Sequence, residues 1–363
     1  MSPNSLATQW VSVALAVIAA AGLAALWNRG RGWWRWPLRA ATALACVTTL
    51  ALVAGIWVNR QMNLFPTWSE VSGRLPDAPP VGQLRVDQVS AAGSRIVTFR
   101  IPGPASGISL PAKAYLPPGY DSAAGRHTRY PVVEALAGFP GTPSVWLLGF
   151  GAQASLDAEI AAGRMAPTVV VFPRQNFNQT RDSECIDAAG GAKFDTYLTQ
   201  DVYAMVTRLL RVRTDRAGWA VIGTSTGGFC ATNLALRHPQ RWSAVASLSG
   251  YYLAVTDPTT GDLYHGDQHL RDQNSPLWRV RNLPLPRLAL FLCVAADDRP
   301  GYREMQEFVT ALKPPVSVTR MVVPQGGHTG AVWRAALPTI WDWLSGWLAA
   351  PEPTGSKPPP SGR

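Results

Sequence analysis

The chain has 363 residues, of which 47% are hydrophobic and only 15% are charged, and its formal net charge is +10. Soluble domains contain about 25% charged residues, so this deficit indicates segments that lie in a membrane. The sequence has no Lys/Arg run and no helical pattern with a basic face. Both are part of the electrostatic footprint of nucleic-acid binding, so we expect no nucleic-acid partner.

Two apolar stretches near the N-terminus, residues 7–27 and 40–58, are each long enough to cross about 30 Å of hydrocarbon as a helix. Residues 28–39 between them carry four arginines and are flanked by tryptophans. The positive-inside rule places such a loop in the cytoplasm. A signal peptide is not indicated, because a basic n-region and a small-residue cleavage site are missing. The pattern predicts a multi-pass anchor in the cell membrane, with everything after residue 58 on the extracytoplasmic side.

The rest of the chain divides into a proline-rich linker over residues 59–83, a globular domain over 84–350 and a disordered tail over 351–363. Within the domain, short apolar runs alternate with helical patterns, which predicts a mostly parallel central sheet with helices on both faces, the α/β class. Strands are expected at 95–101, 113–116, 131–137, 168–172, 219–223, 244–248, 288–294 and 316–323, and helices at 199–210, 227–237, 302–312 and 333–348.

The motif with the clearest chemical meaning is Gly223-Thr224-Ser225-Thr226-Gly227-Gly228. It follows an apolar strand and precedes a helix, which is the context in which G-x-S-x-G forms a nucleophile elbow. The turn is so sharp that the residues two before and two after the serine crowd each other, and only glycine fits there. We expect Ser225 to be the nucleophile of an α/β-hydrolase fold.

A serine nucleophile needs a base and an acid that orients the base. Of the five histidines, His328 stands just after the last expected strand, where this fold places its base. The acid should follow a strand between Ser225 and His328, and Asp297 and Asp298 both stand there. We prefer Asp298 from its distance past the strand, with Asp297 as the alternative.

An oxyanion hole needs two backbone N–H groups. One is expected from Thr226, the residue after the nucleophile, and the other from Phe139, which follows an early strand. With these donors, Ser225 would attack an ester carbonyl and form an acyl-enzyme that water or another alcohol clears. We find no metal-binding or phosphate-cradling motif, so neither a metal nor another cofactor is expected.

The four cysteines leave their pairing open. Cys46 lies in the second apolar stretch, whereas Cys185, Cys230 and Cys293 lie in the outer domain, where oxidation is possible. A disulfide between Cys185 and Cys230 is one of three pairings, and the sequence does not choose among them.

Over about residues 110–349 the chain resembles the α/β hydrolases that include esterase D and the secreted mycolyltransferases, in particular actinobacterial members with a short helical membrane anchor. The segments that carry the resemblance are Gly138 to Gly141, Arg181 to Asp187, Thr196 to Leu198 with Asp201, Gly223 to Gly228, and Gly326 to His328. The resemblance implies the same catalytic pair and oxyanion donors. Mycolyltransferases differ, because they use a glutamate as the acid and have an arginine–glutamine trehalose pocket.

Three functions compete at this point. The first is an extracytoplasmic esterase acting on lipid or cell-envelope esters, with a Ser-Asp-His triad. The second is an acyltransferase that moves an acyl group to a sugar or lipid alcohol. The third is a binding protein that keeps the hydrolase fold without catalysis. The segment Asp182 to Cys185 either lines the mouth of the site or is only a disulfide-tied loop.

Overall fold

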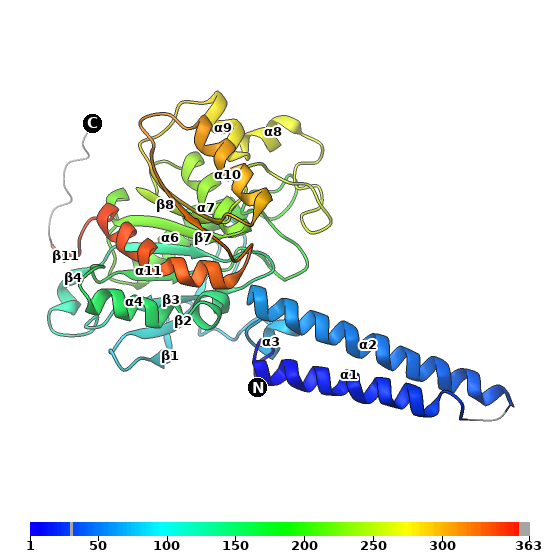
Figure 1. Ribbon diagram of the computed structural model, residues 1–363. Coiled ribbons are helices and arrows are strands. Elements are labelled where there is room, and N and C mark those ends of the chain that lie inside the picture. Colours follow the sequence, from blue (N-terminus) through cyan, green and yellow to red (C-terminus); the bar gives the residue numbers. More distant parts are fainter. Residues whose placement is uncertain (30–31, 356–363) are drawn as a thin grey trace. The chain divides into compact units, whose positions relative to one another are not determined.

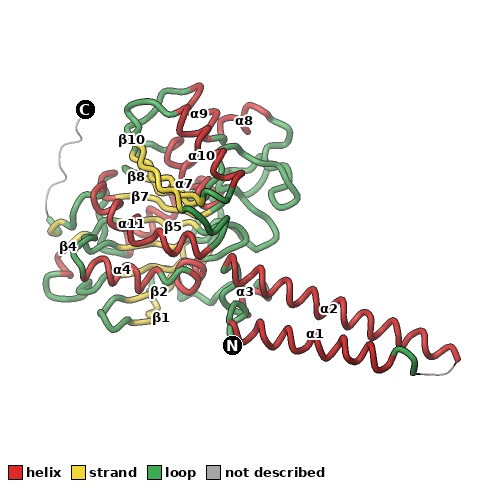
Figure 2. Tube along the Cα trace, viewed as in Figure 1, coloured by secondary structure: helices red, strands yellow, loops and turns green. Residues whose placement is uncertain are grey.

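The computed structural model describes residues 1–29 and 32–355, which form two compact units, Met1–Arg74 and Leu75–Arg363. Arg31, one of the four arginines of the predicted cytoplasmic loop, and residues 356–363 of the predicted tail lie outside the described residues. Figures 1 and 2 trace both units.

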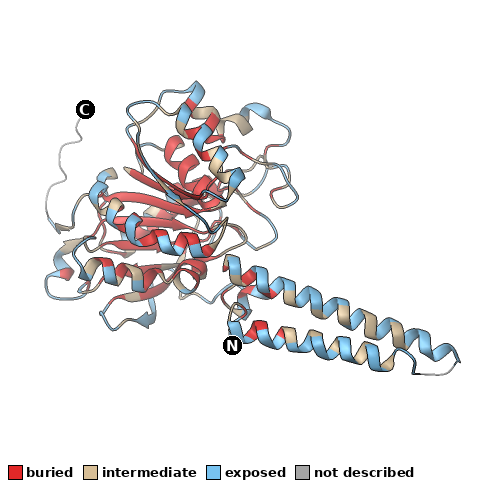
Figure 3. Ribbon diagram, viewed as in Figure 1, coloured by how far each residue is buried: buried red, intermediate tan, exposed pale blue. Residues whose placement is uncertain are grey.

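The first unit is a pair of long helices, α1 (Leu6–Leu26) and α2 (Arg35–Met62), that lie side by side. The Ser5 side chain caps the start of α1, and Asn63 ends α2 in the left-handed conformation. Both helices are long and apolar enough to cross a membrane, by length and composition. Most of their apolar side chains are exposed in the isolated chain (Figure 3).

The predicted linker over residues 59–83 is partly helical, so this prediction was wrong in part. α2 continues to Met62, and a short helix α3 (Trp68–Val71) follows. A capping box stabilises the start of α3, since the Thr67 side chain accepts from the Glu70 amide and the Glu70 side chain accepts from the Thr67 amide. The proline-dense stretch after residue 74 has no helix or strand before Arg85.

The second unit is built on a nine-stranded sheet in the order β1-β2-β3-β6-β5-β7-β8-β9-β10. The strands from β6 to β10 are parallel, whereas β1, β2 and β3 pair antiparallel and β3 joins β6 antiparallel. This confirms the predicted α/β fold with a mostly parallel sheet. The strands are β1 (Arg85–Val89), β2 (Arg95–Ile101), β3 (Leu110–Leu116), β5 (Val132–Leu136), β6 (Val169–Phe172), β7 (Trp219–Thr224), β8 (Ala244–Leu248), β9 (Ala289–Ala295) and β10 (Ser317–Val323).

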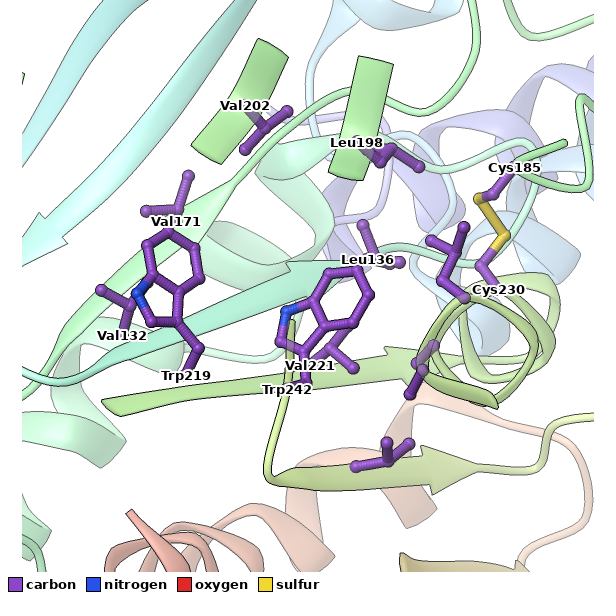
Figure 4. Packing of buried hydrophobic residues seen from close by; sticks show 14 of the residues in the cluster. Val132, Leu136, Val171, Cys185, Leu198, Val202, Trp219, Val221, Cys230 and Trp242 are labelled. Carbon is purple, nitrogen blue, oxygen red and sulfur yellow. A yellow bond between two sulfur atoms is a disulfide. The ribbon is translucent and has the colours of Figure 1, made fainter. Parts of the chain in front are cut away.

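Helices cover both faces of the sheet because the central strands are apolar on both sides. One face packs on α6, α7, α9 and α10, around Trp219, Trp242 and Val221 (Figure 4). The other face packs on α4 and α11, around Trp146 and Trp341. The helices of the unit are α4 (Ala152–Ala161), α5 (Phe194–Thr196), α6 (Val202–Leu209), α7 (Thr226–Arg237), α8 (Gln268–Gln273), α9 (Pro276–Asn282), α10 (Arg299–Ala311) and α11 (Gly330–Trp347).

The tail predicted to be disordered from residue 351 is ordered at its start. β11 (Glu352–Pro353) pairs antiparallel with β4 (Thr128–Arg129). The Arg213 guanidinium holds Glu352 at 2.7 Å between Nη1 and Oε2. The composition rule failed here because a long-range ion pair and two strand residues outweigh the local preference of a Pro/Gly-rich segment for disorder.

Candidate active site

Ser225 stands at the junction between β7 and α7, in the sharp turn that the G-x-S-x-G motif predicts. Its backbone has φ 53° and ψ −123°, a strained conformation for a residue with a side chain. The Ser225 amide donates to the Leu248 carbonyl at 2.8 Å, which ties the turn to the end of β8. The sheet therefore holds the serine in a conformation that the free chain would avoid.

The glycines on either side of Ser225 are required by space. A Cβ on Gly223 would lie 1.9 Å from the Gly227 carbonyl oxygen, and one on Gly227 would lie 2.3 Å from the Leu136 carbonyl oxygen. Both distances are shorter than any real contact, so a side chain at either position would collide with the neighbouring backbone. Only glycine fits at these two positions.

His328 and Asp298 join Ser225 in a continuous chain of hydrogen bonds. His328 Nε2 lies 2.9 Å from Ser225 Oγ, and His328 Nδ1 lies 2.9 Å from Asp298 Oδ2. The Asp298 side chain is 9% exposed and the His328 side chain is 36% exposed. The imidazole is thus open to a ligand, while the carboxylate that it contacts is shielded from water.

Asp297 has a different role from its neighbour. Its two carboxylate oxygens accept from the Gly326 amide at 3.0 Å and from the Gly327 amide at 2.8 Å. These two N–H groups hold the pKa of Asp297 below its usual range. Asp297 therefore shapes the loop that carries His328 and does not contact the imidazole ring.

The two expected oxyanion donors are placed differently relative to Ser225. Thr226 is its neighbour in the chain, whereas the backbone before Phe139 is its neighbour in space. Thr226 is the first residue of α7, where a backbone amide has no acceptor within the helix. On the other side, a Cβ on Gly138 would lie 3.0 Å from the Ser225 Cβ, and the Gly138 amide donates to Thr224 Oγ1 at 3.1 Å. The backbone that leads into Phe139 is therefore packed directly against Ser225.

Trp333 supports the imidazole and was missed in the sequence. Its ring lies edge-on to His328, with 5.2 Å between centroids and 87° between planes. The indole Nε1 donates to Ser249 Oγ at 3.0 Å, which fixes the orientation of the indole. A tryptophan five residues after the candidate base, on the first turns of the following helix, is the signal that could have revealed it.

The segment that starts at Asp182 packs against the elbow. Asp182 Oδ2 accepts from Thr226 Oγ1 at 2.9 Å, and Asp182 is 4% exposed. Burial raises the pKa of Asp182 to about 6. Glu184 accepts from the Tyr251 hydroxyl at 2.9 Å and from the Tyr264 hydroxyl at 3.1 Å, and burial raises its pKa to about 7.

A disulfide joins the same segment to the elbow helix. Cys185 pairs with Cys230, and Cys293 is free and buried in β9. Cys230 lies in α7, five residues after Ser225. The sequence left open whether Asp182 to Cys185 borders the site or is only a disulfide-tied loop. The segment is tied by the disulfide and also contacts Thr226, the residue after Ser225.

The described part of the chain contains no group of three or more His, Cys, Asp or Glu side chains that could hold a metal ion. At Ser225 a hydroxyl lies next to an imidazole, with the first residue of α7 on one side and the backbone at Gly138 on the other. Such an arrangement can activate a nucleophile and stabilise a developing oxyanion.

Residues 105–344 match the family described as "Putative esterase". The chain belongs to this family. Among similar proteins, an uncharacterized protein of Corynebacterium glutamicum is 23% identical over 244 residues, which cover 64% of this chain and 56% of the relative. The solved structure of a ferulic acid esterase has a TM-score of 0.61 and 22% identity, over 70% of this chain and 99% of that chain.

An S-formylglutathione hydrolase from Agrobacterium tumefaciens has a TM-score of 0.59 and 16% identity, over 73% of this chain and all of that chain. At these identities, the two solved structures show the α/β-hydrolase fold of this esterase-family chain. The chain spans about half the length of the curated relative from C. glutamicum.

Proposed function

We propose that this esterase-family chain is a serine hydrolase that cleaves carboxylic esters with Ser225 as nucleophile, His328 as base and Asp298 as orienting acid. The observation that carries the proposal is the unbroken chain of two 2.9 Å hydrogen bonds through the imidazole of His328. A serine, an imidazole and a shielded carboxylate in this order form the triad that activates a hydroxyl at neutral pH.

In the proposed reaction, Ser225 Oγ attacks the ester carbonyl as its proton passes to His328 Nε2. Asp298 stabilises the imidazolium that forms. The amides of Thr226 and Phe139 hold the oxyanion of the tetrahedral intermediate. His328 then protonates the leaving alcohol, and water, activated by the same imidazole, clears the acyl-enzyme.

The proposal includes the membrane. The two N-terminal helices span the bilayer, and the end of the pair that carries Arg29, Arg35 and Arg39 faces the cytoplasm. The segment predicted as a loop over residues 28–39 is partly helical, since α2 begins at Arg35 and includes Arg39. The hydrolase unit is then extracytoplasmic and confined near lipid and cell-envelope esters. Reporter fusions test this topology: alkaline phosphatase fused after residue 74 should be active, and the same reporter fused after residue 29 should be inactive.

The test of catalysis is labelling by a fluorophosphonate, which reacts only with activated serines. We expect the purified full chain in detergent to be labelled at Ser225. Labelling should be lost in Ser225→Ala and strongly reduced in His328→Ala, whereas His127→Ala, a change at a surface histidine, should label like wild type. A folded protein without labelling would contradict the proposal and favour a binding protein. Product analysis with and without a sugar or lipid alcohol separates hydrolysis from acyl transfer.

A further inference from the structure

A cavity of about 250 Å³ lies between the segment that packs on the elbow and the loop that follows Pro258. We call it the 181–263 pocket. Its lining residues are Phe177, Asn178, Arg181, Asp182, Ser183, Ile186, Ala188, Ala192, Phe194, Thr260 and Leu263. Neither the triad nor the oxyanion donors line it, so the proposed mechanism leaves its purpose open.

The 181–263 pocket shares a wall with the candidate active site. Asp182 lines the pocket, and its carboxylate accepts from Thr226, the residue next to Ser225. Two hydrogen bonds to main-chain carbonyls join the two sides of the pocket. The Asp182 amide donates to the Thr259 carbonyl at 3.1 Å, and the Arg181 side chain donates through Nη1 to the Pro258 carbonyl at 3.2 Å. Asp182 and Thr226 form this common wall, so a group that binds in the pocket lies next to the turn that carries Ser225.

The interior of this space suits a compact apolar group. Phe177 and Phe194 meet edge to face with their ring centroids 5.0 Å apart, and Phe177 is 48% exposed. Ile186 and Leu263 add aliphatic surface. A cavity of about 150 Å³ accommodates benzene, so the larger volume here takes an aryl ring with a short substituent or an alkyl group of similar size.

The two charged side chains at the pocket, Asp182 and Arg181, differ in whether protein groups already satisfy their hydrogen bonds. Asp182 accepts from Thr226 and from the Glu184 amide, so both of its oxygens point to protein donors. Arg181 is exposed and, within residues 1–29 and 32–355, has no carboxylate at ion-pair distance. Its guanidinium keeps donors that can pair with an anion, and a planar guanidinium pairs best with a carboxylate or phosphate.

We infer that the 181–263 pocket binds the acyl group of the substrate, a compact aryl or alkyl group that carries an anionic substituent at the end remote from the ester. Arg181 pairs with that substituent, and Phe177 and Phe194 contact the apolar part. This inference rests on the proposed function, because the acyl group is defined by attack of Ser225. It goes further in naming the substrate class and the residues that select it.

The kinetic test uses the full chain in detergent and two matched substrates, the 4-nitrophenyl esters of 4-carboxyphenylacetic acid and of its 4-carbamoyl analogue. A charge-assisted pair contributes about 1.5–3 kcal/mol, so we expect kcat/KM to be at least about tenfold higher for the carboxylate. Arg181→Gln should remove this preference, and Arg181→Lys should keep part of it. Equal kcat/KM for the two esters in wild type would overturn the inference.

A second variant tests the apolar part without changing charge. Ala192→Phe fills the pocket, so kcat/KM for both arylacetyl esters should fall at least about tenfold more than kcat/KM for 4-nitrophenyl acetate, whose acyl group is too short to enter. Leu263→Ala enlarges the space and should raise kcat/KM for bulkier acyl groups relative to the arylacetyl esters. It keeps the inference testable if Ala192→Phe does not fold. Loss of acetate and arylacetyl cleavage in equal proportion in both variants would contradict the inference.

Direct binding separates this inference from the proposed function. The uncleavable amide 4-(carbamoylmethyl)benzoate is titrated into Ser225→Ala by calorimetry and should bind, with at least about tenfold weaker binding in Ser225→Ala with Arg181→Gln. If Ser225 of wild type takes the fluorophosphonate but the amide does not bind, the pocket inference fails alone. If the amide binds through Arg181 but Ser225 is never labelled, the proposed function fails alone.

Discussion

Asp297 and Asp298 are consecutive residues whose carboxylates point to different partners. Asp298 accepts from the ring of His328, whereas Asp297 accepts from the amides of Gly326 and Gly327. The turn after β9 therefore supplies both the acid that orients the imidazole and the anion that holds the loop on which the imidazole stands.

This division predicts unequal effects of the two isosteric changes. Asp298→Asn should lower kcat for 4-nitrophenyl acetate by about 10³–10⁴-fold, because the amide stabilises the wrong tautomer and cannot stabilise the imidazolium. Asp297→Asn should lower kcat by no more than about tenfold, since the amide oxygen can still accept from one glycine amide. Steady-state kinetics on both variants decides the matter, and a larger loss in Asp297→Asn would reverse our assignment.

The elbow predicts a contrast between two glycines. Gly223→Ala should destabilise the domain by about 3 kcal/mol or more, because the new methyl group would lie 1.9 Å from a carbonyl oxygen. Gly346→Ala, in the exposed part of α11 with no atom within 4 Å, should be neutral or stabilise by up to about 1 kcal/mol. Urea unfolding measures both. Equal stability of the two variants would show that the turn relaxes around the methyl group.

The disulfide that ties residue 185 to the elbow helix closes a sequence separation of 45 residues. Chain entropy alone gives about 4 kcal/mol for a loop of this length. The double variant Cys185→Ala with Cys230→Ala should lower the free energy of unfolding by about this amount, which urea unfolding measures. Cys293→Ala, which removes a buried thiol outside the disulfide, serves as the control with a smaller loss. No difference between wild type and the double variant would mean that the two thiols are not joined in solution.

Burial of Glu184 predicts an unusual pH dependence of stability. Its pKa is raised from 4.5 to about 7, so between these values the folded chain retains a proton that the unfolded chain has lost. The free energy of unfolding therefore falls as pH rises from about 5 to 7 on account of this group. Glu184→Gln should gain stability relative to wild type at pH 8 and gain little at pH 5.

Asp257 provides the control of opposite sign. Hydrogen bonds from Thr259 and Thr260 lower the pKa of this carboxyl, so its contribution to stability is present at neutral pH and is lost as pH falls through its pKa. Asp257→Asn should thus lose stability at pH 8 and lose less at low pH. Thermal unfolding at both pH values measures the two variants. If Glu184→Gln loses stability at pH 8 as Asp257→Asn does, the predicted sign for Glu184 is wrong.

Local patterns were sufficient for the elements that position the site. β2 and β8 have the predicted bounds, and β7 and α7 differ from prediction by one residue at one end. Continuous apolar runs predict strands buried on both faces, and the elbow motif records a steric requirement within a few residues. The helix α4 and the short helices α8 and α9 were not predicted, because their few apolar residues form no clear periodic pattern and are buried only by the surfaces that they cover.

The amino-acid sequence by itself determined that Ser225 follows a buried strand in a turn that only glycines permit, because strand burial and steric crowding act between neighbours in the chain. Only the tertiary structure decided which aspartate reaches His328, that Cys185 pairs with Cys230, and that Asp182 touches Thr226. Each of these relations joins residues that are between 30 and 45 positions apart. Their distances depend on the packing of whole strands and helices, which no local pattern records.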